Sequence, residues 1–172
     1  TFSSDALAGN VNFSKNIVND GNFDASSATG TYTLMGSVKT VGGSKATSFG
    51  ILSVTVGTEI LSGVTLNVNN TFSVTAPLTN SGILNSLATS AIAGAGSITN
   101  NGVFSLSNAS IAGTLIPSAD ENTVIYTGAV AQTIKMPTTN PYYNLTIDKS
   151  AGIATMGGTF TVNGDLTIEN GS

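Results

Sequence analysis

The sequence predicts an all-β protein, a right-handed parallel β-helix (a β-solenoid) with coils of about 20 residues. The first reason is a recurring triplet in which a Ser or Thr stands between two apolar residues. Because side chains alternate between the two faces of a strand, each triplet places two apolar groups on one face and a hydroxyl on the other. We therefore expect each triplet to be a short, half-buried strand. The triplets are Tyr32-Thr33-Leu34, Val54-Thr55-Val56, Val64-Thr65-Leu66, Phe72-Ser73-Val74, Phe104-Ser105-Leu106, Leu145-Thr146-Ile147, Phe160-Thr161-Val162 and Leu166-Thr167-Ile168.

The second reason is an internal repeat. The segment TNSGILN at residues 79–85 returns about twenty residues later as TNNGVFS at residues 99–105, a length that suits one coil of a stacked solenoid. Steps from Gly to an apolar residue at Gly63, Gly82 and Gly102 mark successive coils. In this register we expect Phe104 to stack over the preceding coil.

The third reason is the near absence of helix signals. The strongest helix candidate, residues 84–95, is rich in Ala, but Thr, Ser and Gly interrupt it and no capping box precedes it, so a solenoid coil fits it better. Parallel stacking also explains why charged residues are scarce. Equivalent positions of neighbouring coils lie about 4.8 Å apart, where a charge meets its own kind and Thr, Asn or Ser can form ladders. The alternative is an antiparallel β-sandwich, whose short strands and Gly/Asn turns give a similar pattern.

The chain is expected to be a single β-solenoid segment. It divides into irregular coils (1–50), regular coils (51–115), a loop-rich stretch (116–142) and regular coils again (143–172). Strands are expected at residues 11–13, 17–18 and 31–35, and one near 124–126 within the loop-rich stretch, which holds three of the four prolines. Turns are expected at Asn163-Gly164 and Asn170-Gly171, whose residues tolerate positive φ. At about 20 residues per coil, the chain gives on the order of eight coils.

Composition excludes several classes of function. Only 8% of the residues are charged, the formal net charge is -4, and the five lysines are scattered with no Arg beside them. Binding to nucleic acid or to an anionic membrane surface needs clustered basic residues, so we expect neither partner. No apolar run approaches the roughly twenty residues of a spanning helix, so no membrane insertion is expected.

The residues that carry common enzyme chemistry are also missing. Without His, Cys and Arg, triads of the Ser-His-Asp or Cys-His type and the usual zinc sites are excluded. Glycoside hydrolysis needs two carboxyl groups facing across a cleft. Only Asp120 and Glu121 adjoin, and in a Pro-flanked loop they form a solvated turn. The carboxylates are Asp5, Asp20, Asp24, Glu59, Asp120, Glu121, Asp148, Asp165 and Glu169. We therefore predict no catalytic residue and no enzymatic activity.

The metal candidate is the segment DGNFD at residues 20–24. Oxygen-bearing side chains alternate there as at the start of a calcium loop, so Asp20, Asn22 and Asp24 are candidate Ca²⁺ ligands. The segment lacks the following Gly and the distal Glu of an EF-hand. Asn and Asp also populate turns simply by bonding their own backbone. No other cofactor is expected.

The ligand candidates are aromatic or hydroxyl-bearing. Tyr142 and Tyr143 are candidates for stacking on sugar rings, but they point to opposite faces of an extended chain, so at most one is expected to be exposed, and a core or edge role is the alternative. Outward Thr and Asn rows give a further alternative, an ice-binding face. That face needs a Thr-x-Thr pair on every coil, and only residues 31–33 and 159–161 have this form.

The last third of the chain resembles a recurring unit of repeat-rich surface proteins. Its motifs are VIYTG at 124–128, AQT at 131–133, YYNLTI at 142–147 and GGTFTVNGDLTI at 157–168. This stretch, about residues 124–171, is similar to units in large β-solenoid surface proteins of Bacteroidota, many of them adhesins or gliding-motility proteins exported by the type IX secretion system. The resemblance implies export, an outer-surface location and a repetitive β-rich body. It implies no catalytic or binding residue.

These observations together predict an extracellular segment at the bacterial cell surface, a structural stalk or adhesin repeat. Alternatives are a carbohydrate-binding or carbohydrate-active β-helix and an ice-binding solenoid. The expected partners are neighbouring repeats or domains of the same polypeptide, the outer-membrane export machinery during secretion, and surface polysaccharide. Nothing in residues 1–5 or 170–172 looks like a cap, so we expect further coils or another chain to cover both ends.

Overall fold

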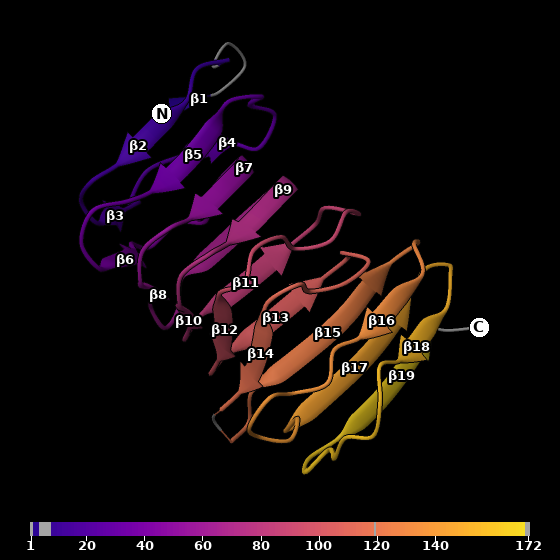
Figure 1. Ribbon diagram of the computed structural model, residues 1–172. Helices are drawn as coiled ribbons and strands as arrows, with labels where there is room; N and C mark the ends of the chain where they lie inside the picture. The colour runs from indigo at the N-terminus through magenta and orange to yellow at the C-terminus, as the bar shows by residue number, and fades with distance from the viewer. Residues whose placement is uncertain (1, 4–7, 119, 171–172) are drawn as a thin grey trace.

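The polypeptide winds into one parallel β-solenoid, as predicted. The computed structural model describes residues 2–3, 8–118 and 120–170, so Asp5 and the proposed turn at Asn170-Gly171 fall outside or at the limit of the described part. About eight turns, about 20 residues apart, stack along one axis, and the two ends of the chain lie at opposite ends of the stack (Figure 1). No helix occurs in the described ranges. Every strand pair there is parallel, which excludes the antiparallel β-sandwich.

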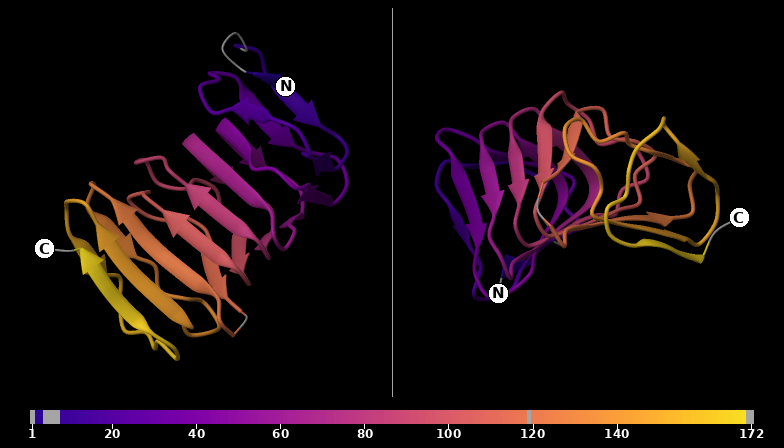
Figure 2. Two further views of the ribbon diagram at one scale, coloured as in Figure 1. Left: turned by 180° about the vertical axis from the view of Figure 1, so that it is seen from behind. Right: turned by 90° about the horizontal axis from the view of Figure 1, so that it is seen from below.

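Three ladders of strands run along this axis, and Figure 2 shows the stack from behind and from below. The long ladder has 11 strands: β1 (Phe2–Ser3), β4 (Phe23–Ala25), β7 (Thr47–Val54), β9 (Thr65–Val74), β11 (Ile83–Ser86), β13 (Val103–Leu106), β15 (Thr123–Gly128), β17 (Asn144–Lys149) and β19 (Leu166–Asn170), with β5 (Thr31–Leu34) also paired to β7 and β2 (Val11–Phe13) paired to β5. The second ladder comprises β3 (Ile17–Val18), β6 (Lys39–Gly42), β8 (Thr58–Ile60), β10 (Leu78–Asn80), β12 (Ser97–Asn100) and β14 (Thr114–Pro117). A third, short ladder pairs β16 (Gln132–Ile134) with β18 (Ala154–Met156).

The register follows the sequence repeat. Leu84 pairs with Phe104 and Ser86 with Leu106, so equivalent positions of β11 and β13 lie directly over one another. Phe104 is fully buried, as predicted. Residues 84–95 begin as β11 and contain no helix, which confirms the prediction of a solenoid coil there. The irregular first stretch also contains the expected strands, at β2, β3 and β5.

Three of the eight triplets depart from the expected half-buried strand. Val54-Thr55-Val56 begins at the last residue of β7 and continues into a bend. Phe160-Thr161-Val162 forms no strand, and only a bridge joins Val162 to Tyr142. Leu166-Thr167-Ile168 does form β19, but both apolar side chains are exposed because β19 is the last strand described. The triplet therefore predicts which side chains point to the same face of the strand. Whether its apolar side chains are buried depends on a following coil that covers them.

Glycine marks the corners where the backbones of successive coils come closest. A Cβ on Gly102 would overlap the carbonyl oxygen of Gly82, and a Cβ on Gly82 would overlap that of Val64. Gly63, Gly82 and Gly102 mark successive coils as predicted, and Gly82 lies level with Val64, whose carbonyl accepts the Ile83 N–H (2.8 Å). Only glycine leaves room for this backbone-on-backbone approach.

Polar ladders accompany the apolar core. Asn85 Nδ2 donates to Asn67 Oδ1 (2.9 Å), and Asn67 Nδ2 donates to Ser48 Oγ (3.0 Å) on the outer face of the long ladder. At a buried corner, Asn80 Nδ2 donates to Asn100 Oδ1 (2.8 Å). Uncharged amide and hydroxyl side chains thus form hydrogen bonds between neighbouring coils, as predicted from the scarcity of charged residues.

Candidate functional surfaces

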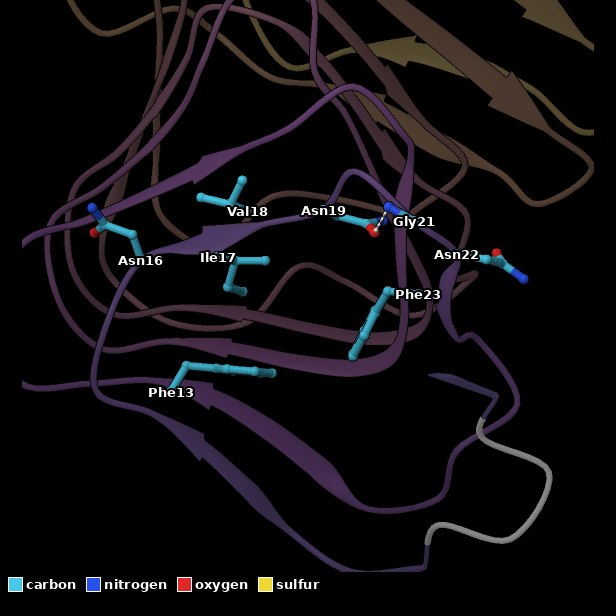
Figure 3. A pocket seen from close by; sticks show the side chains of 8 residues that line it. All are labelled: Phe13, Asn16, Ile17, Val18, Asn19, Gly21, Asn22 and Phe23. Carbon is cyan, nitrogen blue, oxygen red and sulfur yellow. Dashed lines mark hydrogen bonds between the residues drawn. The ribbon is translucent and has the colours of Figure 1, made fainter. Parts of the chain in front are cut away.

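The calcium candidates Asp20, Asn22 and Asp24 lie at the corner between the first two coils. Asp20 Oδ1 accepts the backbone N–H of Ser44 (2.9 Å), and Asp24 Oδ1 accepts that of Ser26 (3.0 Å). These hydrogen bonds from Ser26 lower the pKa of the Asp24 carboxyl. Asn22 is exposed and its side chain points away from the neighbouring hollow (Figure 3).

The contacts of the two aspartates are those of turn residues. Asp24 accepts the N–H two residues further on, which is the local role that Asp commonly has in turns, whereas Asp20 accepts the N–H of Ser44 in the next coil. Among the described residues, no group of three or more acidic, His or Cys side chains is placed to hold a metal ion. The hydrogen bonds of these aspartates need no metal ion. Calcium binding at Asp20, Asn22 and Asp24 therefore stays a prediction.

Asp120 and Glu121 form the expected solvated turn. Both residues are exposed, and Glu121 has a φ of 65°, in the left-handed region. Asp120 lines a shallow hollow beside Tyr143, and no second carboxylate lines that hollow. Paired acid and base catalysis on a sugar needs two carboxyl groups facing across a cleft, and the adjacent pair does not provide this arrangement.

The two tyrosines proposed for sugar stacking have different environments. Tyr142 is fully buried, and its hydroxyl donates to the carbonyl oxygen of Lys135 (2.5 Å). The hydroxyl oxygens of Tyr142 and Tyr126 lie 3.2 Å apart, and the Lys135 N–H donates to the Tyr126 hydroxyl (2.8 Å). Burial raises the pKa of both hydroxyls. The pair braces the loop-rich stretch from inside, so only Tyr143 can meet a ligand.

Tyr143 lines a shallow surface hollow of about 180 Å³. It is half-buried, whereas Asp120, Asn140 and Asn163 beside it are exposed. The hollow combines one aromatic ring with a carboxylate and two amides, and this is a combination suited to the hydroxyl groups and apolar face of a sugar ring. Pro117, Ser118 and Pro141 complete the lining.

A buried lysine near the last coil escaped the sequence analysis. Lys149 Nζ donates to the carbonyl oxygens of Thr127 (3.1 Å) and Val130 (2.7 Å) and to Gln132 Oε1 (2.5 Å). Gln132 Nε2 in turn donates to two carbonyl oxygens of the preceding coil. Burial lowers the pKa of the Lys149 ammonium. All three ammonium hydrogens have acceptors, so the contacts identify a structural cation that ties three coils together.

An ice-binding face needs a regular row of hydroxyl groups along the coils, and the outward-pointing residues of the second ladder form one row that can be compared with this requirement. Its successive positions are Thr40, Glu59, Thr79, Thr99 and Ile116. A carboxylate and an isoleucine therefore interrupt the hydroxyl row. The Thr-x-Thr segment at residues 159–161 lies outside any strand. Neither arrangement forms a paired hydroxyl row along the coils.

In comparisons with protein-family models, with curated proteins and with solved structures, no match to the chain was found. In the described part of the chain, no helix has the length and apolar character needed to cross a membrane.

Proposed function

We propose that the chain is a structural segment of an extracellular protein at the bacterial cell surface, working as a stalk or adhesin repeat and not as an enzyme. The observation that carries this proposal is the continuity of the long ladder. Each strand of this ladder from β4 to β17 pairs on both sides, and a single apolar column runs through the coils beneath it. Stacked coils add length at constant cross-section, because each coil needs only its neighbours for stability.

The outer faces support the same proposal. They carry hydroxyl and amide ladders in place of charges, so the rod stays hydrated without a field that would attract nucleic acid or anionic lipid. The carboxylates described above are engaged as turn caps or lie on exposed turns. This composition is consistent with a rigid spacer that carries few reactive groups.

The location is tested by labelling cells of the source organism with antibodies against the purified chain. Intact cells should be labelled as strongly as permeabilised cells, and brief protease treatment of intact cells should remove the signal. Labelling that needs permeabilisation would contradict the proposed surface location. A cytoplasmic protein expressed in the same cells serves as the integrity control.

A second candidate function, carbohydrate binding, is favoured by the hollow at Tyr143. In affinity electrophoresis through gels containing soluble neutral polysaccharides, a binding chain migrates more slowly than in a blank gel. Tyr143→Ala should abolish the retardation, while Tyr32→Phe, a change inside the core, should preserve it. Equal migration of the native chain in all gels would remove this candidate.

A further inference from the structure

Two neighbouring hollows lie on the side of the rod, where the second ladder ends. The Tyr143 hollow, described above, has a volume of about 180 Å³. A second hollow of about 270 Å³, which we call the Thr159 hollow, lies between residues 137–141 of one coil and residues 159–161 of the next. Asn140 and Pro141 line both hollows, so the hollows lie on two sides of one turn. We call the two hollows together the side groove.

The lengths of successive coils explain why the surface is hollowed here. Two residues separate β12 from β13, but five separate β14 from β15 in the next coil. Between the paired positions of two later coils, residues 135–141 number seven and residues 157–161 number five. A longer segment between fixed pairing positions has to bulge outward, so each hollow lies beside a bulge. Pro137 and Pro141 have no N–H to donate, which fits the end of the second ladder at β14.

The polar side chains of the side groove are free to bind a ligand. In the described part of the chain, the side chains of Asn140, Thr159, Thr161 and Asn163 form no hydrogen bond, and all four residues are exposed. The amides of the polar ladders, in contrast, are bonded to neighbouring coils. The side groove therefore offers donors and acceptors that the chain itself does not use.

Two aromatic rings supply apolar contacts in the side groove. Tyr143 is half-buried in one hollow and Phe160 is half-buried in the other. Phe160 packs edge-on against the buried Tyr142, with ring centroids 5.3 Å apart, so the core holds this ring in place. An aromatic ring beside free hydroxyl and amide groups suits a sugar ring, which has an apolar face and a rim of hydroxyl groups.

From this arrangement we infer that the side groove binds a linear neutral oligosaccharide that fills both hollows and crosses the turn at Asn140. The inference rests on the carbohydrate binding proposed above as the second candidate function, and it adds a second subsite and a class of ligand. Ligand sites commonly have volumes of about 300–1,000 Å³. Each hollow alone is smaller than this, whereas the two volumes together come to about 450 Å³.

The charge of the side groove favours neutral sugars. Asp120 is the one charged residue among the described residues that line the two hollows. The chain as a whole has a formal net charge of -4. A uronic acid or a sulfated sugar would therefore meet a carboxylate with no cation beside it, which is unfavourable. The hydroxyl groups of a neutral sugar can instead donate to the Asp120 carboxylate.

Isothermal titration calorimetry with oligosaccharides of increasing length tests for two subsites. The neutral probes are the cello-, xylo- and manno-oligosaccharides from the disaccharide to the hexasaccharide, and oligogalacturonates are the acidic probes. We expect at least one neutral series to bind, with an affinity that rises with length until both hollows are filled. Equal affinity for the disaccharide and the hexasaccharide would overturn the second subsite. Tighter binding of the acidic probes would overturn the class of ligand.

Removing the hydroxyl groups of the Thr159 hollow separates the two subsites. A chain with both Thr159→Ala and Thr161→Ala should bind the hexasaccharide about tenfold more weakly and the disaccharide, held at Tyr143, as tightly as the native chain does. Thr155→Ala, a change of an exposed Thr outside both hollows, is the matched control and should leave both affinities unchanged. Native affinity of the double variant for the hexasaccharide would overturn the inference.

Changes at Tyr143 distinguish failure of the inference from failure of the second candidate function. Tyr143→Phe keeps the ring and should keep binding, whereas Tyr143→Ala should abolish it. If Tyr143→Ala abolishes binding and the double Thr variant changes nothing, carbohydrate binding at Tyr143 stands and the second subsite is wrong. If no probe binds, the inference and the second candidate function both fail, and the structural role at the cell surface is unaffected.

Discussion

Replacing Phe104 by Ala probes the packing between coils most clearly. Phe104 is fully buried on β13, with Leu84 at the same position of the preceding coil and Val124 at that of the next. Transfer of the ring to water costs about 1.5–3 kcal/mol, and the cavity adds to this. The backbone ladders on both sides hold the coils apart, so the site cannot collapse. We therefore expect the free energy of unfolding to fall by about 3–5 kcal/mol.

The assay is urea unfolding followed by far-UV circular dichroism, with thermal unfolding as a second measure. For a chain of this size the loss corresponds to a fall in Tm of roughly 6–20 °C. Val103→Ala is the matched control, because Val103 is the adjacent residue and its side chain points outward. It should cost at most about 1 kcal/mol. A cost for Phe104→Ala below about 1 kcal/mol, or equal costs for the two variants, would refute the assigned faces of β13.

Four further outcomes are expected. Gly102→Ala should lower the free energy of unfolding by about 1–3 kcal/mol, since its Cβ meets backbone that cannot move aside; an unchanged urea midpoint would contradict the corner geometry. Asn80→Ala should cost about 2–3 kcal/mol in the same assay because buried partners are left unpaired, and a neutral effect would remove the structural role of the buried ladder. Lys149→Met should destabilise the chain by leaving three acceptors unsatisfied. Since the pKa of Lys149 is lowered in the folded state, the native chain should gain stability over this variant as pH rises from that lowered pKa toward 10.5, and a loss over this range would contradict the assignment. Incubation with bacterial, algal and host polysaccharides should release no reducing ends or unsaturated products, whereas turnover abolished by Asp120→Asn or Glu121→Gln would overturn the non-enzymatic proposal.

The period of the sequence was sufficient to predict the coils. Alternation of apolar and polar residues identifies the buried face of a strand, and the repeat of about twenty residues identifies which strands are neighbours, as Leu84 and Phe104 show. Between the coils of Thr65 and Ile83 the spacing is 18 residues, so Gly63 lies one residue before the position level with Gly82, a detail that the pairing of the strands shows and the spacing of the glycines does not. The spacing of the repeat is therefore enough to predict the stacked coils, but it does not predict which residue lies at each corner.

The buried polar groups could not be predicted in the same way. Lys149 follows Asp148 at the end of a strand, where a lysine is usually solvated, and its burial depends on acceptors that residues 127–132 of the preceding coil supply. The hydroxyl pair of Tyr126 and Tyr142 likewise joins residues from different coils. The exposure of Ile168 depends on its being in the last described coil and not on its triplet. Each of these features is a property of tertiary neighbours.

Distances between paired spin labels test the central claim, a single parallel solenoid, most directly. Ser48, Asn67, Asn85, Ser105, Ile125, Thr146 and Thr167 occupy one row of the long ladder. At about 4.8 Å per coil, Thr167 lies about 19 Å from Asn85, four coils away, and about 29 Å from Ser48, six coils away. Nitroxide labels on Cys at Thr167 with Asn85, and at Thr167 with Ser48, should give mean separations by double electron–electron resonance that differ by about 10 Å. Separations that are equal, or that are shorter for Ser48 than for Asn85, would contradict a continuous parallel stack.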